Sequence, residues 1–236
     1  MDRAELLKLF QGLRVTDVCD GLDAVGLIDT CTMDWNIRPI WRDTETFAHR
    51  FYGFAHTIRY VPTNRVVPNG LSVEDWVKWK GQWYRDLAPD PQLPIIPGEV
   101  LVVDGSNDRT TGFLGSHNTL KMFAQGMRGF VSNAGARDTD ESIRQKVPIY
   151  AACITKGWRP GRLELDGENI PVAVGGVRVF PGDLVVADGD GVIVVPIDLA
   201  EQVGKIAREI ANGDKVGRKR LYEKAGMRLD DTLDIL

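Results

Sequence analysis

One run of residues places a cationic side chain next to three carboxylates. The run is Gly135-Ala136-Arg137-Asp138-Thr139-Asp140-Glu141, and it directly follows residues 129–133, which have the composition of a strand. Carboxylate oxygens suit Mg²⁺ or Mn²⁺, and a planar guanidinium matches a substrate carboxylate through two parallel hydrogen bonds. Loops that follow strands in layered α/β folds often face a crevice. The run indicates either such a site or, equally well, a helix start whose acidic residues complement its positive end.

A glycine-bearing loop is the second candidate site. It reads Gly112-Phe113-Leu114-Gly115-Ser116-His117-Asn118 and leads into a segment, 118–125, with helical composition. Backbone N–H groups at such a junction attract anions. The loop has neither the GxxxxGK[ST] nor the GxGxxG pattern, so a plain capped turn is the favoured interpretation from these residues alone. His117 is a candidate general base or ligand, although a lone loop histidine more often serves as a polar cap.

Several other chemistries are disfavoured. The three histidines accompany no GxSxG elbow and lack HExxH spacing, and the three cysteines form no CxxC pair, which argues against a serine nucleophile and against zinc. A formal net charge of −4 argues against a nucleic-acid surface. The chain shows no apolar run of about 18 residues and no apolar leader at its N-terminus, so we expect a cytoplasmic protein without a membrane segment.

The elements that must position these residues alternate between helix and strand. Apolar spacing predicts a helix over residues 4–13 and a second one that begins at an N-cap on Thr16. Two segments, 97–105 and 181–189, share a pattern in which Pro-Gly precedes an apolar run that ends in Asp-Gly. Each predicts a turn, a strand buried on both faces and a second turn. Strands are also expected near 51–60, 129–133, 148–152 and 192–195, with helices near 140–145 and 199–210 and a polar C-terminal arm.

The segment from 63 to 96 differs from the rest in its content of Pro, Asn, Asp and Trp. Within it Trp76, Trp79 and Trp83 share one side of a helix that is predicted to begin near Ser72. Such an aromatic stripe more often packs against the protein itself or a neighbouring subunit than lines a pocket. The 236 residues are interpreted as one domain that carries this segment as an insert.

Several motifs in order resemble the RraA-like family, which includes the 4-hydroxy-4-methyl-2-oxoglutarate aldolases. The strongest is Gly115 followed, after a helix and a strand, by Arg137-Asp138-x-x-Glu141. The stretches 16–23, 97–105, 177–183 and 188–192 are also similar to the family. The likeness covers most of the chain outside residues 63–96.

The resemblance implies an α/β fold of the αββα type with a compact β-barrel core, an N-terminal helical pair and a C-terminal helical arm. It implies a metal-dependent lyase, an aldolase or decarboxylase acting on a 2-oxo acid, in homotrimers or homohexamers with sites between subunits. Mg²⁺ or Mn²⁺ would bind Asp138 and Glu141, Arg137 and His117 would be catalytic, and the substrate would contact a set of residues from both motifs: Gly115, Ser116, His117, Asn118 and Arg137.

Two departures from the family pattern bear on this expectation. Ser116 stands where the aldolases usually carry an acidic residue, so either His117 takes over proton transfer or the substrate differs. The tryptophan-bearing segment 63–96 is longer than the family needs, and we hypothesise that it caps the site and selects a larger substrate. The aldolases also use a carboxylate from a neighbour's C-terminal arm, for which Glu209 and Glu223 are the candidates.

Two alternatives stay open at this point. Some family members bind and inhibit ribonuclease E or its helicase partners, a role that does not need the retained Arg137, Asp138 and Glu141. Another possibility is an enzyme on the same scaffold that acts on sugar acids or lactones, which Ser116 and the insert would favour.

Overall fold

The computed structural model describes residues 1–236 and opens with two helices that pack on the long C-terminal helix. Helix α1 (Arg3–Phe10) begins with a capping box between Asp2 and Glu5. Helix α2 (Val15–Ala24) begins one residue before Thr16, so the predicted Thr16 cap is wrong. The N-cap residue is Arg14, two positions before Thr16, and the Asp17 carboxylate accepts the Arg14 N–H at 2.8 Å.

Helix α6 (Ala200–Ala225) follows the short 3-10 turn η1 (Ile197–Leu199) and runs well beyond the predicted end near residue 210. Its small buried residues, Gly204 and Ala207 among them, lie against α1 and α2. Beyond Ala211 the helix is mostly polar, but Lys, Arg, Glu and Ala are good helix formers. The chain then folds back through η2 (Asp231–Leu233), where Lys215 and Arg218 donate hydrogen bonds to the Thr232 carbonyl.

A nine-stranded mixed sheet forms the centre of the molecule, with the order β1-β6-β5-β3-β2-β10-β11. Strands β2, β3, β5 and β6 are parallel neighbours, whereas β10 pairs antiparallel with β2 and β11, and β1 pairs antiparallel with β6. Strand β4 pairs with β5, and β7 with β2. The bounds are β1 Arg38–Pro39, β2 Phe51–Pro62, β3 Glu99–Asp104, β4 Gly112–Leu114, β5 Gly129–Ala136, β6 Ile149–Ile154, β7 Leu163–Glu168, β10 Leu184–Asp188 and β11 Gly191–Val195.

The sheet is nearly closed into a barrel, as the resemblance to the RraA-like family implied. Residues that lead into β1 lie against β11 at the other end of the strand order: Met33 N–H donates to Val192, and Val194 N–H donates to Cys31, each at 3.0 Å. A hairpin of β8 (Val172–Val174) and β9 (Val177–Val179) packs its valines into the interior. The inside is filled by alternate strand residues such as Val100, Val102, Val131, Tyr150, Val185 and Val194.

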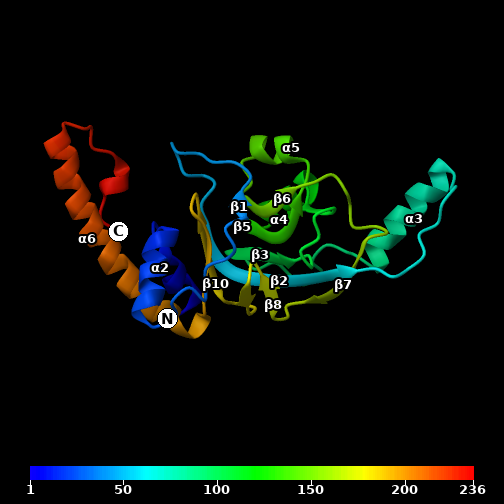
Figure 1. Ribbon diagram of the computed structural model, residues 1–236, viewed down its shortest axis with the longest axis horizontal. Coiled ribbons are helices and arrows are strands. Elements are labelled where there is room, and N and C mark those ends of the chain that lie inside the picture. Colours follow the sequence, from blue (N-terminus) through cyan, green and yellow to red (C-terminus); the bar gives the residue numbers. More distant parts are fainter.

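The two strands with the shared Pro-Gly pattern flank β2 on opposite sides, β3 in parallel and β10 antiparallel. Every residue of both is buried, which confirms the predicted two-sided burial. Leu101 and Val103 point outward under helices α4 (Ser116–Ala124) and α5 (Thr139–Arg144), whereas Leu184 and Val186 point toward α1, α2 and α6. The barrel therefore has a separate helical layer at each end (Figure 1).

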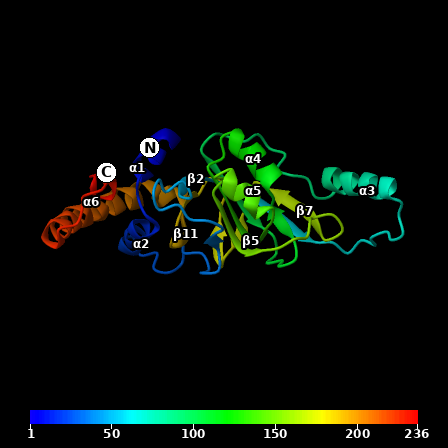
Figure 2. The same ribbon diagram turned by 90° about the horizontal axis from the view of Figure 1, so that it is seen from above.

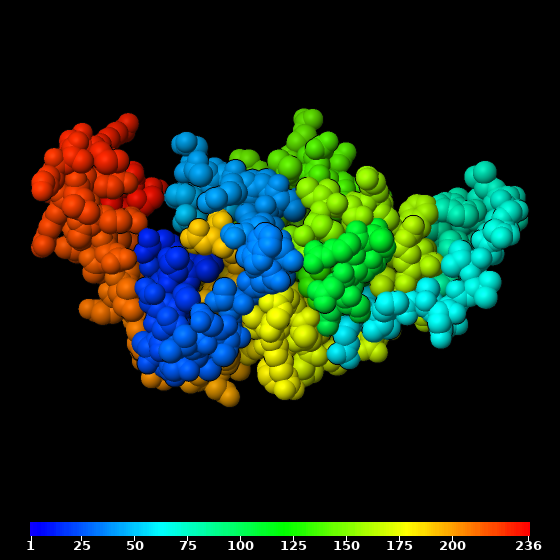
Figure 3. Space-filling model, viewed as in Figure 1, coloured from blue at the N-terminus to red at the C-terminus, as the bar shows by residue number.

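Helix α3 (Val73–Asp86) stands off from the body at the end of the molecule opposite α6 (Figures 1 to 3). The helix begins where it was predicted to, and Ser72 is its N-cap. Trp83 is buried in the core and its indole N–H donates to the Leu163 carbonyl at 2.9 Å, while Trp79 packs beside it and Trp76 stacks on Trp158. The tryptophan stripe is thus a packing surface, which confirms that prediction. None of the helices combines the length and apolarity that crossing a membrane requires.

Candidate functional site

The two motifs singled out in the sequence meet because β4 and β5 are adjacent parallel strands. Strand β4 ends at Leu114 and leads through Gly115 into α4; strand β5 ends at Ala136 and leads through Arg137 and Asp138 into α5. The Arg137 N–H donates to the Leu114 carbonyl at 3.0 Å and fixes the two ends together. Sites in open α/β sheets gather at such carboxyl ends.

Two glycines leave the space that Arg137 and Asp138 occupy. A Cβ added to Gly112 would lie 2.6 Å from the Arg137 Cβ, and one added to Gly115 would lie 3.0 Å from the Asp138 Oδ2. The Arg137 Nε donates to the Asp138 Oδ1 at 3.3 Å, so the two charged groups lie side by side. Their side chains are 28% and 39% exposed, which leaves both accessible to a ligand.

Asp138 has a left-handed backbone, with φ 53° and ψ 43°, at the N-cap position of α5. Aspartate tolerates this region better than most residues, yet it is still strained, and such strain gathers at functional sites. An N-cap aspartate normally accepts a hydrogen bond from the helix, but the Asp138 carboxylate makes none. Asp140 and Glu141 lie exposed in the first turn of α5 and fit the helix-start interpretation; Asp138 does not.

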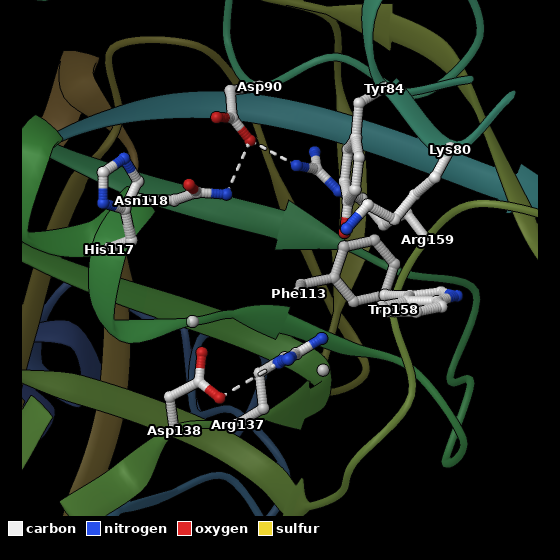
Figure 4. Close-up of a pocket in the computed structure, with 12 residues that line it drawn as sticks. Lys80, Tyr84, Asp90, Phe113, His117, Asn118, Arg137, Asp138, Trp158 and Arg159 are labelled. Carbon is white, nitrogen blue, oxygen red and sulfur yellow. Dashed lines mark hydrogen bonds and ion pairs between the residues drawn. The ribbon is translucent and has the colours of Figure 1, made fainter. Parts of the chain in front are cut away.

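These residues form the floor of a pocket of about 360 Å³. Figure 4 shows Arg137 and Asp138 below, Asn118 and His117 from α4 to one side, and Phe113 and Trp158 on the other. His117 is exposed at the rim. Of the predicted site residues, the structure thus brings Gly115, His117, Asn118, Arg137 and Asp138 together, and it leaves Ser116 and Glu141 outside the residues that line the pocket.

The roof of the pocket comes from residues that the sequence motifs did not reveal. Asp90 accepts a hydrogen bond from the Asn118 amide at 3.0 Å and forms an ion pair with Arg159. The Arg159 side chain is only 5% exposed, lies between the rings of Tyr60 and Tyr84, and donates to the Tyr60 hydroxyl at 2.8 Å. These contacts fix the end of the 63–96 segment to α4.

Helix α3 also reaches the pocket, because Lys80 and Tyr84 line it together with Asp90. The only sequence signal for this wall was the unusual composition of residues 63–96. Arg159 and Trp158 follow β6 and carried no local signal. Their contact with a segment about seventy positions earlier in the chain depends on tertiary packing.

The Asp138 carboxylate offers an oxygen for a cation, because only its Oδ1 is bonded to Arg137. No group of three or more His, Cys, Asp or Glu side chains in this chain is arranged to hold a metal ion by itself, and the Asp90 carboxylate is held by Arg159 and Asn118. Mg²⁺ is often bound through one or two carboxylates with water and substrate oxygens as its remaining ligands. Asp138 lines the pocket with its side chain 39% exposed, so its carboxylate is accessible as one ligand of such an ion.

Glu209 and Glu223 both lie exposed on α6, at the opposite end of the molecule from α3 (Figure 1). Neither lines the pocket of its own chain.

Fold and site together define a mixed α/β protein with a barrel-like sheet and a cation–carboxylate pair at the ends of two parallel strands. Residues 15–194 match the family model described as RraA-like, Aldolase/RraA. The chain belongs to the RraA-like family.

Three relatives illustrate the similarity in sequence. A Thermus thermophilus protein named 4-hydroxy-4-methyl-2-oxoglutarate aldolase is 36% identical over 101 residues, which cover 42% of this chain and 60% of that protein. This chain likewise matches 60% of the length of a relative from Halalkalibacterium halodurans. A Burkholderia mallei protein that carries the same name provisionally is 34% identical over 182 residues, 76% of this chain and 93% of its own.

Solved structures confirm the fold. The Streptomyces coelicolor protein RraAS2, described as an unusual member of the RNase ES inhibitor RraA family, superposes with a TM-score of 0.73 at 24% identity and covers 93% of this chain and all of its own. An uncharacterised protein from Pseudomonas syringae gives a TM-score of 0.71 at 24% identity, with 97% of this chain and 96% of its own covered.

Proposed function

We propose that the protein is a divalent-metal-dependent lyase that breaks a carbon–carbon bond next to a 2-oxo acid. The substrate is a 4-hydroxy-2-oxo acid in aldol cleavage or an oxaloacetate-like acid in decarboxylation. The observation that supports this most is the Arg137–Asp138 pair on the pocket floor, with each side chain in space left by a glycine. The relatives named as aldolases support the same reaction class.

Arg137 binds and orients the substrate. Its Nε faces Asp138, and its exposed terminal N–H groups can donate to the carboxylate and the 2-oxo oxygen of the acid. When the C3–C4 bond breaks, its electron pair passes into the three-carbon fragment as an enolate, whose charge lies on the former 2-oxo oxygen. A guanidinium that is already in place stabilises that charge as it develops. Protonation at C3 then gives pyruvate.

Asp138 would hold Mg²⁺ or Mn²⁺, which supplies further positive charge beside Arg137. We assign this role to Asp138 without Glu141, because the Glu141 side chain is exposed on α5 and does not line the pocket.

The two reactions make different demands on His117. Aldol cleavage must remove the proton of the C4 hydroxyl, and His117 at the rim is the titratable side chain that we assign to accept it. Decarboxylation releases CO₂ and needs no such acceptor. Loss of His117 should therefore reduce aldol cleavage more than decarboxylation.

We also propose that the chain forms a homo-oligomer, a trimer or hexamer, in which α6 of one subunit reaches another. Beyond Ala211, α6 carries exposed apolar side chains, Val216 and Leu221, at 45% and 63% exposure. In this arrangement Glu209 or Glu223 would approach a neighbour's pocket. Light scattering at several protein concentrations tests the assembly directly.

The lyase proposal is tested by pyruvate release from a panel of 2-oxo acids with Mg²⁺, with Mn²⁺ and with EDTA. Asp138→Asn keeps a side chain that tolerates the left-handed backbone and removes the charge; Asp138→Ala removes the carboxylate entirely. We expect each to lose at least about a hundredfold in turnover, the scale seen when a charge-stabilising group is removed. Asp140→Ala, exposed on the same helix, is the matched control and should retain activity. Activity that resists EDTA, or equal activity in the Asp138 and Asp140 variants, would refute the proposal.

A further inference from the structure

Lys80 is the one pocket cation that has no carboxylate partner. Arg137 faces Asp138 and Arg159 faces Asp90, whereas no carboxylate oxygen lies within salt-bridge distance of the Lys80 ammonium. Lys78, two residues earlier on α3 and 68% exposed, is by contrast paired with Glu74 at 2.7 Å. A positive charge inside a cleft without its own counterion favours an anionic ligand.

Aromatic rings hold the Lys80 ammonium in place. It lies 5.2 Å from the centre of the Trp76 ring and 5.1 Å from that of Trp158. The two rings contact each other with centroids 4.9 Å apart. Figure 4 shows the side chain running from α3 into the pocket above Trp158. This placement reduces the rotamer freedom that a lysine must otherwise lose on binding an anion.

The wall between Lys80 and Arg137 is aromatic. Tyr84, Phe113 and Trp158 are the pocket's apolar side chains, and in Figure 4 Phe113 and Trp158 separate the Lys80 end from the Arg137 end. A ligand that touches both cations must therefore pass over ring faces, which favour carbon over polar groups. The pocket therefore has a cationic side chain at each end, Lys80 and Arg137, and an apolar wall between them.

The α3 wall is rigid enough to set a length. Trp83 anchors the helix through its buried ring and its hydrogen bond to Leu163, and Asp90 fixes the end of the segment to Arg159 and Asn118. Lys80 therefore lies at a defined position relative to the floor, as a residue that measures ligand length must.

We propose that Lys80 is a specificity residue that binds a second carboxylate, at the far end of a 2-oxo acid with an apolar spacer. This rests on the proposed function, since the first head group of the acid is the one that Arg137 binds. The 63–96 segment thereby selects dicarboxylic 2-oxo acids longer than oxaloacetate over monocarboxylic 2-oxo acids of the same length.

The test uses two inert acids that differ only in the distal group, 2-oxoadipate and 2-oxohexanoate. Their dissociation constants are measured with Mg²⁺ present by calorimetry and by the fluorescence of the tryptophans beside Lys80. A third acid carries a terminal phosphonate in place of the distal carboxylate, which distinguishes carboxylate from phosphate recognition. Pyruvate release from oxaloacetate is followed in parallel on every variant.

Wild type should bind 2-oxoadipate about tenfold more tightly than 2-oxohexanoate, a difference of ~1.4 kcal/mol. Lys80→Met keeps the chain length without the charge and should reduce the preference below about twofold, while Lys80→Arg keeps most of it. Lys78→Met is the control on the same helix and should leave the preference unchanged. Turnover of oxaloacetate should persist in Lys78→Met, which lies outside the pocket.

Equal binding of the two acids by wild type, with pyruvate release intact, would overturn the role of Lys80 and leave the lyase proposal standing. A preference that survives in Lys80→Met would do the same. If neither acid binds and oxaloacetate is not turned over, the proposed function itself fails and the Lys80 assignment fails with it. Tighter binding of the phosphonate than of 2-oxoadipate would overturn the carboxylate assignment and show that Lys80 recognises a phosphate group.

Discussion

At the scale of single residues, the absence of side chains at Gly112 and Gly115 matters as much as the charges next to them. Neither glycine is needed here for a positive φ; Gly115, for instance, has φ −97°. What requires glycine is the close approach of Arg137 and Asp138 from the neighbouring strand. Arg137 and Asp138 can thus take their positions because Gly112 on β4 and Gly115 before α4 have no Cβ.

Gly115→Ala isolates this effect. The backbone accepts alanine, but the new Cβ lies 3.0 Å from the Asp138 Oδ2, so the carboxylate must move by a few tenths of an ångström or rotate away. We expect turnover to fall about ten- to hundredfold, the cost of a small misplacement of a reacting group, with the thermal midpoint nearly unchanged. Paired activity and thermal-unfolding measurements check this. An unaffected turnover would show that Asp138 need not hold its present position.

At the scale of elements, α3 is a helix attached to one end of the nearly closed barrel, where it forms one wall of the pocket. It contacts the body mainly through its tryptophan face, where Trp83 is 4% exposed, while Trp76 and Trp79 are only half-buried. A helix attached along one stripe can open without the rest of the molecule unfolding.

Trp83→Ala should loosen α3 locally. Removal of a buried tryptophan costs about 3 kcal/mol, which corresponds to about a hundredfold faster exchange if only the attached helix opens. Hydrogen exchange resolved by segment should show this acceleration in residues 73–86 and none in β3. Trp76→Ala, which removes a half-exposed ring from the same face, should have a smaller effect. Faster exchange throughout the barrel would contradict the view of α3 as a separable wall.

At the scale of the whole molecule, a buried cluster connects three strands of the sheet. His56 on β2 lies between Glu99 on β3 and Glu168 on β7, with Nδ1 3.0 Å from one carboxylate and Nε2 2.7 Å from the other. Burial lowers the pKa of His56, but the hydrogen bonds with Glu99 and Glu168 outweigh burial, so the net pKa is raised above 6.5. Burial raises the pKa of Glu99, and its bonds from His56 and the Ile96 N–H outweigh that, so its net pKa is lowered.

The stability of the fold should therefore depend on pH on both sides of a maximum. The contribution of His56 is full below pH 6.5, its ordinary pKa, and is lost as the pH rises through the raised pKa. The contribution of Glu99 is present above pH 4.5 and is lost as the pH falls through the lowered pKa. Denaturant unfolding as a function of pH should place the greatest stability between these values.

His56→Gln should remove the alkaline limb of this profile. The variant loses charge-assisted hydrogen bonds, so we expect about 2 kcal/mol of destabilisation near pH 6 and a smaller difference once the pH has risen through the raised pKa of His56 and its imidazole is neutral. The same denaturant series on both proteins measures it. Parallel profiles would show that His56 is not charged in the folded state. Because the cluster also holds the Gln92 and Leu93 N–H groups through Glu168, loss of stability should extend to the end of the 63–96 segment.

Much of the fold could be predicted because it follows from local pattern. The Pro-Gly turns, the apolar runs of β3 and β10, the helix that begins near Ser72 and the helix after Asp138 each depend on residues close in sequence. The errors lie where a local signal was incomplete. Thr16 was predicted as an N-cap, but the N-cap is Arg14, whose N–H donates to the Asp17 carboxylate. Helix α6 was predicted to end near residue 210, but it continues to Ala225 after its apolar periodicity ends.

The sequence by itself singled out the residues of the floor, Arg137 and Asp138 directly after a predicted strand and Gly115 in a loop. Tertiary pairing placed them together, because residues 112–114 of that loop form β4 beside β5. Only the tertiary structure decided the roof. Asp90, Arg159 and Lys80 meet the floor because α3 packs its tryptophans on the outer face of the sheet, and no short-range pattern encodes which face a distant segment will cover. Tertiary packing also separated Asp138, which turns into the pocket from a left-handed backbone, from Asp140 and Glu141, which merely begin a helix.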